Sequence, residues 1–532
     1  MTPHRSRRTL LSLALSVCLA GLSVGTSAQG FDPAKVDWEK LSKIPMQDGF
    51  IRQFNDQCAA CHGEDLRGTS LGKPLIGVDL THGTAVKDIA QSIARGFPDA
   101  GMPAWSATLN ESQIWNLALY VAEQRQGTTI LDKRAGIALN IPTTPVTSEL
   151  QTFRVETVAE GLDPMPFSIA LLPDGRILLS ERMRGLSIIG KDGKPSAPIT
   201  GTPAVYADST LFLGQVQGLG WMLDVALDPQ YGKNGWIYLH HTDRCSDCND
   251  LSRRSHRPVS MNRLIRGRIR DGAWIDQEIL WQADIATYTD TSDLAAGGRI
   301  AFDDTGHVYF SVGMKAPLDY MGIQDLTLPY GKIHRLHQDG RVPADNPFTS
   351  TPGALKSIWT YGHRSVQGLE FNTQTKDVWS TEMGPRGGDE LNRLQKARNY
   401  GWPLFTNGVN YDGRPVDVAK VLNSKLEAKD VEFPVVDMTP SQAISSFVFY
   451  RGKAFPHWQN QIIVGTLRAT DLLRMAVVDN KVVHTETLLK DLARFRDIEV
   501  GPGGEIYLLL ENGAGSRIVR LVPGQARPGQ AQ

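Results

Sequence analysis

Three short stretches near the start of the chain place apolar residues at helical spacing. In the first, Phe50, Ile51, Phe54 and Cys58 fall three to four residues apart after Asp48. The other two are residues 85–95, where Val86, Ile89 and Ile93 form the stripe and Gly96 stops it, and a stretch opened by the capping-box pair Asn110 and Gln113, where Ile114, Leu117, Ala118 and Val121 form the stripe. The pattern predicts a small all-α domain over residues 29–126.

Beyond residue 150 the pattern changes to short apolar strands separated by Pro, Asp and Gly turns. A unit of strand, turn and second strand recurs six times, in residues 169–179, 225–239, 299–310, 368–379, 446–465 and 498–508. Six such units exceed what one β-sandwich needs. We therefore expect a multidomain chain in which an all-β six-bladed propeller, residues 151–523, follows the helical domain.

The remaining segments connect or flank these two domains. Residues 127–150 lack periodicity and carry Thr- and Pro-rich pieces, so they are predicted to be a linker that wraps or spaces. Residues 1–28 have basic residues, an apolar run over 9–24 and a small-residue cleavage site, which indicates a signal peptide. Residues 524–532 form a tail. No later apolar run reaches the length needed to cross a membrane, so we expect a secreted, periplasmic protein that does not span one.

Composition narrows the possible partners. The 532 residues are 41% hydrophobic and 21% charged, with a formal net charge of −1. A chain this close to neutral has no overall field that would attract nucleic acid, so we expect no nucleic-acid partner.

Cys58-Ala59-Ala60-Cys61-His62 is the attachment signature of a c-type haem. Each thiol can add across one vinyl group of the porphyrin, and the adjoining imidazole of His62 then reaches the iron. The alternatives are a chance CxxC or a disulfide. Met102, in a Pro-flanked loop, is the candidate for the second axial ligand, because a thioether is a soft ligand that raises the iron's reduction potential. The alternative is that Met102 only fills a gap in the core. Residues from about 37 to about 126 resemble a class I cytochrome c.

Two cysteines remain outside the signal peptide and the haem motif, Cys245 and Cys248. In an oxidising compartment a surface disulfide is the preferred interpretation. Metal binding would need two further ligands, and His240, His241 and His256 keep it open.

Several motifs in the propeller fall in one order along the chain: residues 331–336, 339–340, 345–347, 361–368, 382–392 and 399–403. Together they resemble the soluble PQQ-dependent glucose and sorbosone dehydrogenases, over roughly residues 153–522. The resemblance implies a propeller that binds PQQ and calcium and oxidises a sugar or alcohol. PQQ is an ortho-quinone trianion, which needs cations around it.

The resemblance also assigns roles to individual residues. Arg364 lies at the position that polarises the reactive quinone carbonyl, and Arg494 and Arg496 match the pair that meets the carboxylates, for which planar guanidinium groups are suited. Arg468 stands where the family usually has lysine. The calcium ligands implied are the backbone oxygens of Gly384 and Pro385 at the cofactor, with Asp389, Glu390 and Tyr400 near a second, structural calcium.

Three positions depart from the family pattern. Ala295 stands where the catalytic histidine is expected, four residues before Arg299, and Ser365 and Met383 replace polar residues on the cofactor face. The loop over residues 288–294 carries two carboxylates. Of these, Asp293 is the candidate base, provided that it enters the same cleft; the alternative is a turn residue that caps a strand.

Three functions follow from these observations. The first is a quinohaemoprotein dehydrogenase that oxidises a sugar or alcohol at PQQ and passes electrons through haem c to a downstream acceptor. The second is a non-catalytic propeller that binds a ligand or partner beside an electron-transfer cytochrome. The third is a different quinone-like or metal cofactor in the cleft.

Overall fold

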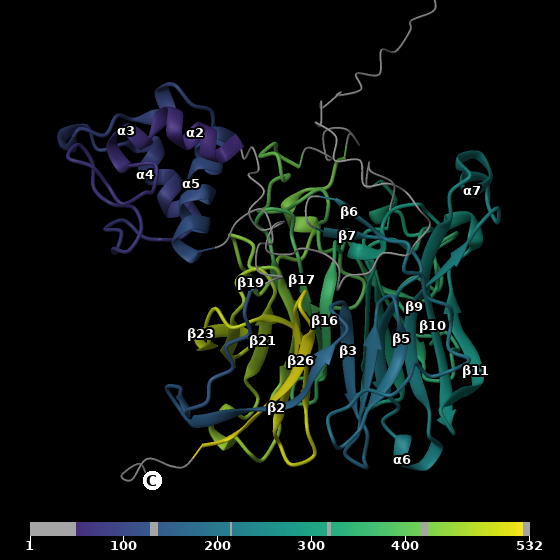
Figure 1. The fold of residues 1–532 in the computed structure, drawn as a ribbon. Helices are drawn as coiled ribbons and strands as arrows, with labels where there is room; N and C mark the ends of the chain where they lie inside the picture. Colours follow the sequence, from purple (N-terminus) through teal and green to yellow (C-terminus); the bar gives the residue numbers. More distant parts are fainter. Residues whose placement is uncertain (1–48, 128–136, 213–214, 316–320, 417–423, 525–532) are drawn as a thin grey trace, which may run out of the picture.

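The computed structural model describes residues 49–127, 137–212, 215–315, 321–416 and 424–524. The predicted signal peptide, the start of the helical domain and residues 525–532 lie outside these ranges. Figure 1 shows two bodies, a small helical domain and a large β-propeller beside it. The predicted combination of folds is thereby confirmed.

The helical domain contains the three predicted helical stretches. Asn110 caps the last of them, since its side chain accepts a hydrogen bond from Gln113 N at 2.9 Å and Gln113 Oε1 accepts one from Asn110 N at 3.0 Å. Ile51 is 41% exposed, so the inward stripe of the first helix narrows to Phe50, Phe54 and Cys58. The elements are α2 (Gly49–Gln57), α3 (Ala59–His62), α4 (Val86–Arg95), η2 (Pro98–Ala100), η3 (Trp105–Ala107) and α5 (Glu111–Gln126).

Each of the six predicted strand–turn–strand units forms the first two strands of an antiparallel blade. The first blade contains β3 (Pro166–Leu171), β4 (Ile177–Glu181) and β5 (Gly185–Ile189), and the second contains β8 (Met222–Leu227), β9 (Ile237–Cys245), β10 (Val259–Arg270) and β11 (Ala273–Gln282). The third contains β12 (Gly297–Phe302), β13 (His307–Val312), β14 (Lys332–His337) and β15 (Ile358–Tyr361), and the fourth contains β16 (Val366–Asn372), β17 (Asp377–Glu382), β18 (Glu390–Leu394) and β19 (Val436–Asp437). The fifth contains β20 (Ile444–Phe449), β21 (Ile462–Thr466), β22 (Leu472–Val478) and β23 (Lys481–Leu489).

The sixth blade joins the two ends of the propeller. Its strands β24 (Arg494–Val500), β25 (Ile506–Glu511) and β26 (Ser516–Pro523) continue into β2 (Thr152–Leu162), which pairs antiparallel with β26, and then into β1 (Val146–Thr147). Part of the predicted linker therefore belongs to the propeller.

Shorter elements decorate the blades. A two-stranded hairpin, β6 (Thr210–Phe212) and β7 (Gln215–Gln217), follows the first blade. Cys245, at the end of β9, forms the predicted disulfide with Cys248. The short helices are α6 (Tyr231–Asn234), α7 (Asp250–Ser255), η4 (Ile285–Thr287), η5 (Asp293–Ala295), η6 (Met321–Ile323), η7 (Ala428–Asp430) and η8 (Pro456–Trp458).

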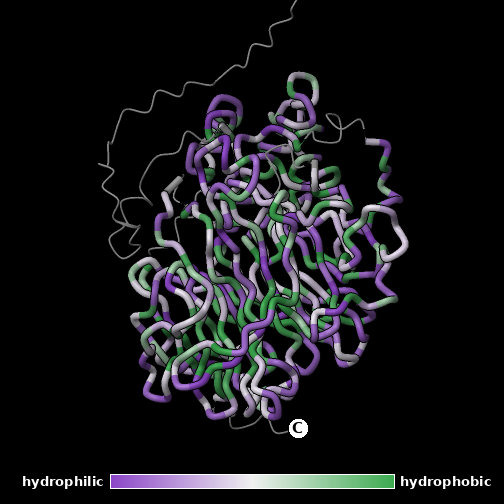
Figure 2. The backbone as a smooth tube through the Cα atoms, turned by 90° about the vertical axis from the view of Figure 1, so that its right-hand side faces the viewer, coloured by the Kyte–Doolittle hydropathy of each residue, from purple (hydrophilic) through white to green (hydrophobic). Residues whose placement is uncertain are grey.

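The core lies between neighbouring blades, where large aromatic residues are fully buried. Trp221, Trp379 and Trp458 are at most 1% exposed. Figure 2 shows the apolar backbone stretches running along the strands, with polar stretches concentrated in the loops at the ends of the propeller. No helix in the described ranges is long and apolar enough to cross a lipid bilayer.

The innermost strands β3, β8, β12, β16, β20 and β24 contact one another in a closed ring around the propeller axis. Each is followed by an antiparallel strand, so the residues just before an innermost strand and those just after the second strand meet at the same end of the propeller. Residues from many distant parts of the sequence are therefore brought together there.

Candidate functional site

A cavity of about 510 Å³ opens at this end of the propeller. Its wall includes four of the predicted cofactor residues, Arg364, Arg468, Arg494 and Arg496, and also Gly384. Ala295, Ser365 and Met383, the three departures from the family pattern, line the same cavity. The structure therefore brings the centre of the predicted site together.

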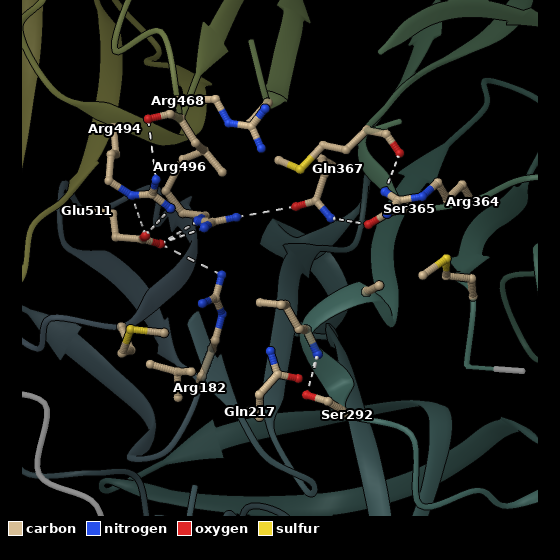
Figure 3. A pocket seen from close by; sticks show the side chains of 18 of the residues that line it. Arg182, Gln217, Ser292, Arg364, Ser365, Gln367, Arg468, Arg494, Arg496 and Glu511 are labelled. Atoms are coloured by element: carbon tan, nitrogen blue, oxygen red, sulfur yellow. Dashed lines mark hydrogen bonds and ion pairs between the residues drawn. The ribbon is translucent and has the colours of Figure 1, made fainter. Parts of the chain in front are cut away.

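Arg494, Arg496 and Arg182 converge on one carboxylate, that of Glu511 (Figure 3). Arg494 Nε donates to Glu511 Oε1 at 2.7 Å, and Arg496 Nε donates to Oε2, also at 2.7 Å. Arg182 Nη2 lies 3.7 Å from Glu511 Oε2. Sequence reasoning missed Arg182 and Glu511. The sequence could have indicated them by their position, because Arg182 directly follows the apolar second strand β4 and Glu511 ends the apolar second strand β25.

This cluster carries excess positive charge in a buried place. The guanidinium groups hold the pKa of Glu511 well below its ordinary value despite burial. Burial lowers the pKa of Arg496 to about 9, while the charge of Glu511 opposes that shift. With Arg468 and Arg364 there are five guanidinium groups around the cavity for one paired carboxylate, and the buried Nε atoms of those last two have no hydrogen-bond partner among the described residues. The arrangement suits a multiply charged anion.

Arg364 lies two residues before the start of β16, with its guanidinium 5.3 Å from the centre of the Trp402 ring. Its Nη1 donates to the carbonyl oxygens of Met383 and Gly384, both at 2.8 Å. The Gly384 carbonyl is one of the oxygens predicted to hold calcium, and here it already accepts a hydrogen bond from a cation. A calcium ion bound to this oxygen would lie beside the positive charge of Arg364, so the present arrangement disfavours calcium there.

The residues that replace the family's polar groups are joined by hydrogen bonds. Arg496 Nη1 donates to Gln367 Oε1 at 3.3 Å, and Gln367 Nε2 donates to Ser365 Oγ at 3.0 Å (Figure 3). Met383 N donates to Ser365 O at 3.0 Å, and Met314 N donates to Arg364 O at 2.7 Å. Two methionines therefore flank the strand start that carries Arg364.

The prediction that Asp293 enters the cavity is wrong for this structure. Its carboxylate forms a buried ion pair with Lys315 and accepts hydrogen bonds from Ser260 Oγ at 2.8 Å, from Gly220 N at 2.6 Å and from Thr242 Oγ1. Asp293 begins the short helix η5, and its side chain points into the buried region between blades. Its role is therefore structural, as the alternative of a turn residue predicted. The other carboxylate of the same loop, Asp290, is exposed and lines the cavity together with Ala295.

The second set of predicted calcium ligands does not converge. Asp389 accepts hydrogen bonds from Gly384 N at 3.0 Å and Ile444 N at 3.1 Å, and so braces the loop that lines the cavity. Glu390 lies on β18, where burial and the charge of Glu382 raise its pKa well above the ordinary value. The Tyr400 hydroxyl donates to Arg393 O at 2.5 Å. Among the described residues there is no group of three or more His, Cys, Asp and Glu side chains placed to hold a metal ion.

The haem residues lie together in the helical domain. Cys58 and Cys61 are not joined to each other, which agrees with haem attachment and not with the disulfide alternative. His62 Nδ1 lies 2.7 Å from Lys73 O; since a carbonyl only accepts, Nδ1 carries the proton and Nε2 is left for the iron. Met102 and Cys58 pack on the same apolar cluster. The residues fit a covalently held haem.

A propeller with a cationic cavity, joined to a helical domain with a haem-attachment motif, defines a two-domain redox protein. The chain belongs to the Glucose / Sorbosone dehydrogenase family, whose model matches residues 163–520. Residues 51–121 match the family described as Cytochrome C oxidase, cbb3-type, subunit III, and are a cytochrome c domain. Both resemblances noted in the sequence are thereby confirmed.

Individual relatives agree with this assignment. The aldose sugar dehydrogenase YliI of Escherichia coli is 33% identical over 371 residues, which cover 68% of this chain and 91% of the relative. The apo-form crystal structure of the soluble aldose sugar dehydrogenase from Escherichia coli has a TM-score of 0.61 at 32% identity, and the match covers 70% of this chain and 100% of that one. The CcoP subunit of the cbb3-type cytochrome c oxidase of Azospirillum brasilense is 35% identical over 74 residues, 13% of this chain and 25% of the relative.

Proposed function

We propose that this protein is a periplasmic PQQ-dependent dehydrogenase that oxidises a sugar or alcohol and passes the electrons to its own haem c. The observation that carries the proposal is the excess of guanidinium groups around the cavity in a chain that also contains a cytochrome c domain. The names of the relatives, aldose sugar dehydrogenases among them, support the same substrate class.

The chain's own residues divide the work. When bound, PQQ supplies an ortho-quinone that accepts two electrons from the substrate. Arg494, Arg496 and Arg468 bind its carboxylates, and Glu511 keeps the first two oriented. Arg364 places a fixed positive charge in the cavity wall, just before β16, where it would stabilise negative charge that develops on a quinone oxygen.

Substrate oxidation also requires a group that takes the hydroxyl proton. Ala295 cannot accept it, and Asp293 is held in a buried ion pair. Asp290 is the carboxylate that the structure places at the cavity from the same loop, so we assign it the proton-accepting role.

The test uses purified full-length protein loaded with PQQ, with the haem absorption bands followed as aldoses and alcohols are added. Haem reduction that requires both PQQ and substrate would support the proposal. PQQ binding with haem that stays oxidised across a broad panel would instead favour the non-catalytic ligand-binding propeller, for which the replacement of the family's histidine by Ala295 is the specific observation. Failure to bind PQQ would point to another cofactor.

A further inference from the structure

The loop that lines the cavity also contacts the cytochrome domain. Gly384 belongs to the cavity wall, whereas Arg386, two residues later, is completely buried against α5. Arg386 Nε donates to Glu123 Oε1 at 2.8 Å and Arg386 Nη2 donates to Glu123 Oε2 at 2.7 Å. The pair is bidentate, and both side chains are at most 2% exposed. A bidentate Arg–carboxylate pair fixes orientation as well as distance.

Apolar contacts surround this ion pair. The Arg386 guanidinium lies 3.6 Å from the centre of the Phe50 ring of α2. Val409 pairs with Arg386 through two backbone hydrogen bonds, of 3.0 and 3.1 Å, and joins the apolar cluster of the cytochrome domain. A propeller residue therefore completes the core of the helical domain.

A second propeller loop approaches the same place. Gly413 O accepts a hydrogen bond from Asn116 Nδ2 of α5 at 2.8 Å. Gly413 has φ +85°, and a Cβ atom at this position would lie 2.2 Å from the Phe50 ring. Only glycine permits so close an approach of this loop backbone to the cytochrome domain.

The contact lies on the same helix as the haem motif. Phe50, Phe54 and Cys58 are four residues apart and so share one face of α2 and its end. Cys58 N donates to Phe54 O at 2.7 Å, which continues the helical bonding up to the first haem cysteine. Gly384, in the cavity wall, is two residues from Arg386, and Arg386 contacts Phe50. Phe50 lies on the same face of α2 as Cys58, which is predicted to form a haem thioether.

We propose that Arg386, Glu123 and Phe50 form a docking contact that holds the cytochrome domain in one orientation against the cavity wall, and that electrons pass from the cavity to the haem of the same chain by this route. The inference rests on the proposed function for its electron-transfer part. With both cofactors bound, the two electrons of reduced PQQ would leave one at a time and its two protons would pass to solvent. Each electron would reduce Fe(III) to Fe(II), and a soluble one-electron acceptor would reoxidise the iron between the two transfers.

Docking is tested by solution X-ray scattering of the full chain, which needs no cofactor. Glu123→Gln and Arg386→Gln each leave a buried polar group without its partner, so the maximum dimension should increase. Glu123→Leu combined with Arg386→Met replaces the pair by apolar groups, a change that buried ion pairs often tolerate, and should restore the compact dimension. Arg176→Gln, which breaks the exposed pair with Asp174, is the matched control. The haem spectrum and thermal midpoint report whether each variant is folded.

Electron transfer is tested with PQQ that has been reduced before it is added, so no substrate is needed. In the parent, the rate of haem reduction at saturating PQQ should not depend on protein concentration. In the two single variants it should fall at least tenfold, and in the double variant it should recover. Unchanged scattering in both single variants would overturn the docking contact, and unchanged rates would overturn the route. If reduced PQQ reduces the haem but no substrate does, the proposed function fails while this inference stands.

Discussion

Lys315 holds Asp293 inside the propeller, in an ion pair whose two side chains have no exposed surface. The ammonium group also donates to Ser260 Oγ at 2.7 Å and to Thr291 O at 3.0 Å. Asp293 was the acid that its place in the sequence favoured as a catalytic base. The ion pair gives it a different task, which is to fix the loop that carries Asp290 at the cavity.

Asp293→Asn should therefore act on stability. It leaves the buried Lys315 ammonium without a counter-charge, and breaking a buried pair in this way costs about 3–5 kcal/mol. Chemical denaturation of the full chain should show a loss of that order. PQQ-dependent haem reduction by the folded fraction should persist; its complete loss in a fully folded sample would return Asp293 to the mechanism.

Asp290→Asn should have the opposite profile. The side chain is exposed, so the change in the free energy of unfolding should stay within about 0.5 kcal/mol. If Asp290 accepts the substrate proton, substrate-driven haem reduction should be lost while PQQ binding, measured by equilibrium titration, is retained. Full activity in this variant would remove Asp290 from the proposal. Asp284→Asn, at an exposed acid that precedes this loop and lies outside the cavity wall, is the control.

Arg494→Gln should weaken PQQ binding. A hydrogen bond to a charged group contributes about 1.5–3 kcal/mol, which corresponds to a loss of about 10- to 150-fold in affinity. Calorimetric titration with PQQ measures this directly. Arg517→Gln removes a guanidinium outside the cavity, near Glu160, and should leave affinity unchanged. Equal affinities of the parent and the Arg494 variant would show that PQQ carboxylates bind elsewhere.

Met102→Ala should change the haem rather than the fold. Loss of a thioether ligand should alter the spin state seen in the absorption spectrum and lower the reduction potential. Ile51→Ala, an exposed apolar position on α2, should alter neither. A Met102 variant with the parent's spectrum and potential would mean that another residue binds the iron.

Glu370, near the centre of the propeller, should make a contribution to stability that falls as the pH rises. Burial raises the pKa of Glu370 from 4.5 to about 8, and the charges of Asp497 and Asp224 add to the effect while Arg451 opposes it. The folded protein therefore keeps a proton that the unfolded chain releases. This contribution to stability is complete below about pH 4.5 and is lost as the pH rises to about 8.

Glu370→Gln removes this dependence. Between pH 5 and pH 8, the difference between the thermal midpoint of this variant and that of the parent should shift in favour of the variant, because only the parent loses the Glu370 contribution. Glu160→Gln, at an exposed acid, should track the parent. Identical pH profiles for the Glu370 variant and the parent would contradict the assignment.

The fold was predictable from sequence because it depends on local signals. The capping pair of Asn110 and Gln113 set the start of α5, and apolar runs broken by turns set the first two strands of every blade. The haem motif was equally local. The short strand β1 could not be predicted from such local signals, because it forms only by pairing with β2 in the folded structure.

The site was predictable only where motif order fixed it. Arg494 and Arg496 were found because the resemblance places them, whereas Glu511, the residue that holds both, comes from the next strand and belongs to no recognised motif. Asp293 was misplaced because nearness in sequence does not fix the direction of a side chain, and its partner Lys315 lies beyond two strands and the turn between them. The pair of Arg386 and Glu123 joins residues 263 positions apart, so only the folded structure could show it.

The pairing of β2 with β26 has a consequence for the order in which the molecule assembles. Glu156 and Arg520, which are bonded across these strands, stand 364 positions apart. The ring of blades therefore stays open, with two unpaired strand edges, until nearly the last residue has been synthesised. Contacts between such distant segments form slowly, because the chain must close a long loop before it gains them. The pairing of β2 with β26 is thus the step that closes the whole ring. The cavity, whose wall includes Arg494, Arg496 and Glu511 of the sixth blade, is complete only after this pairing has formed.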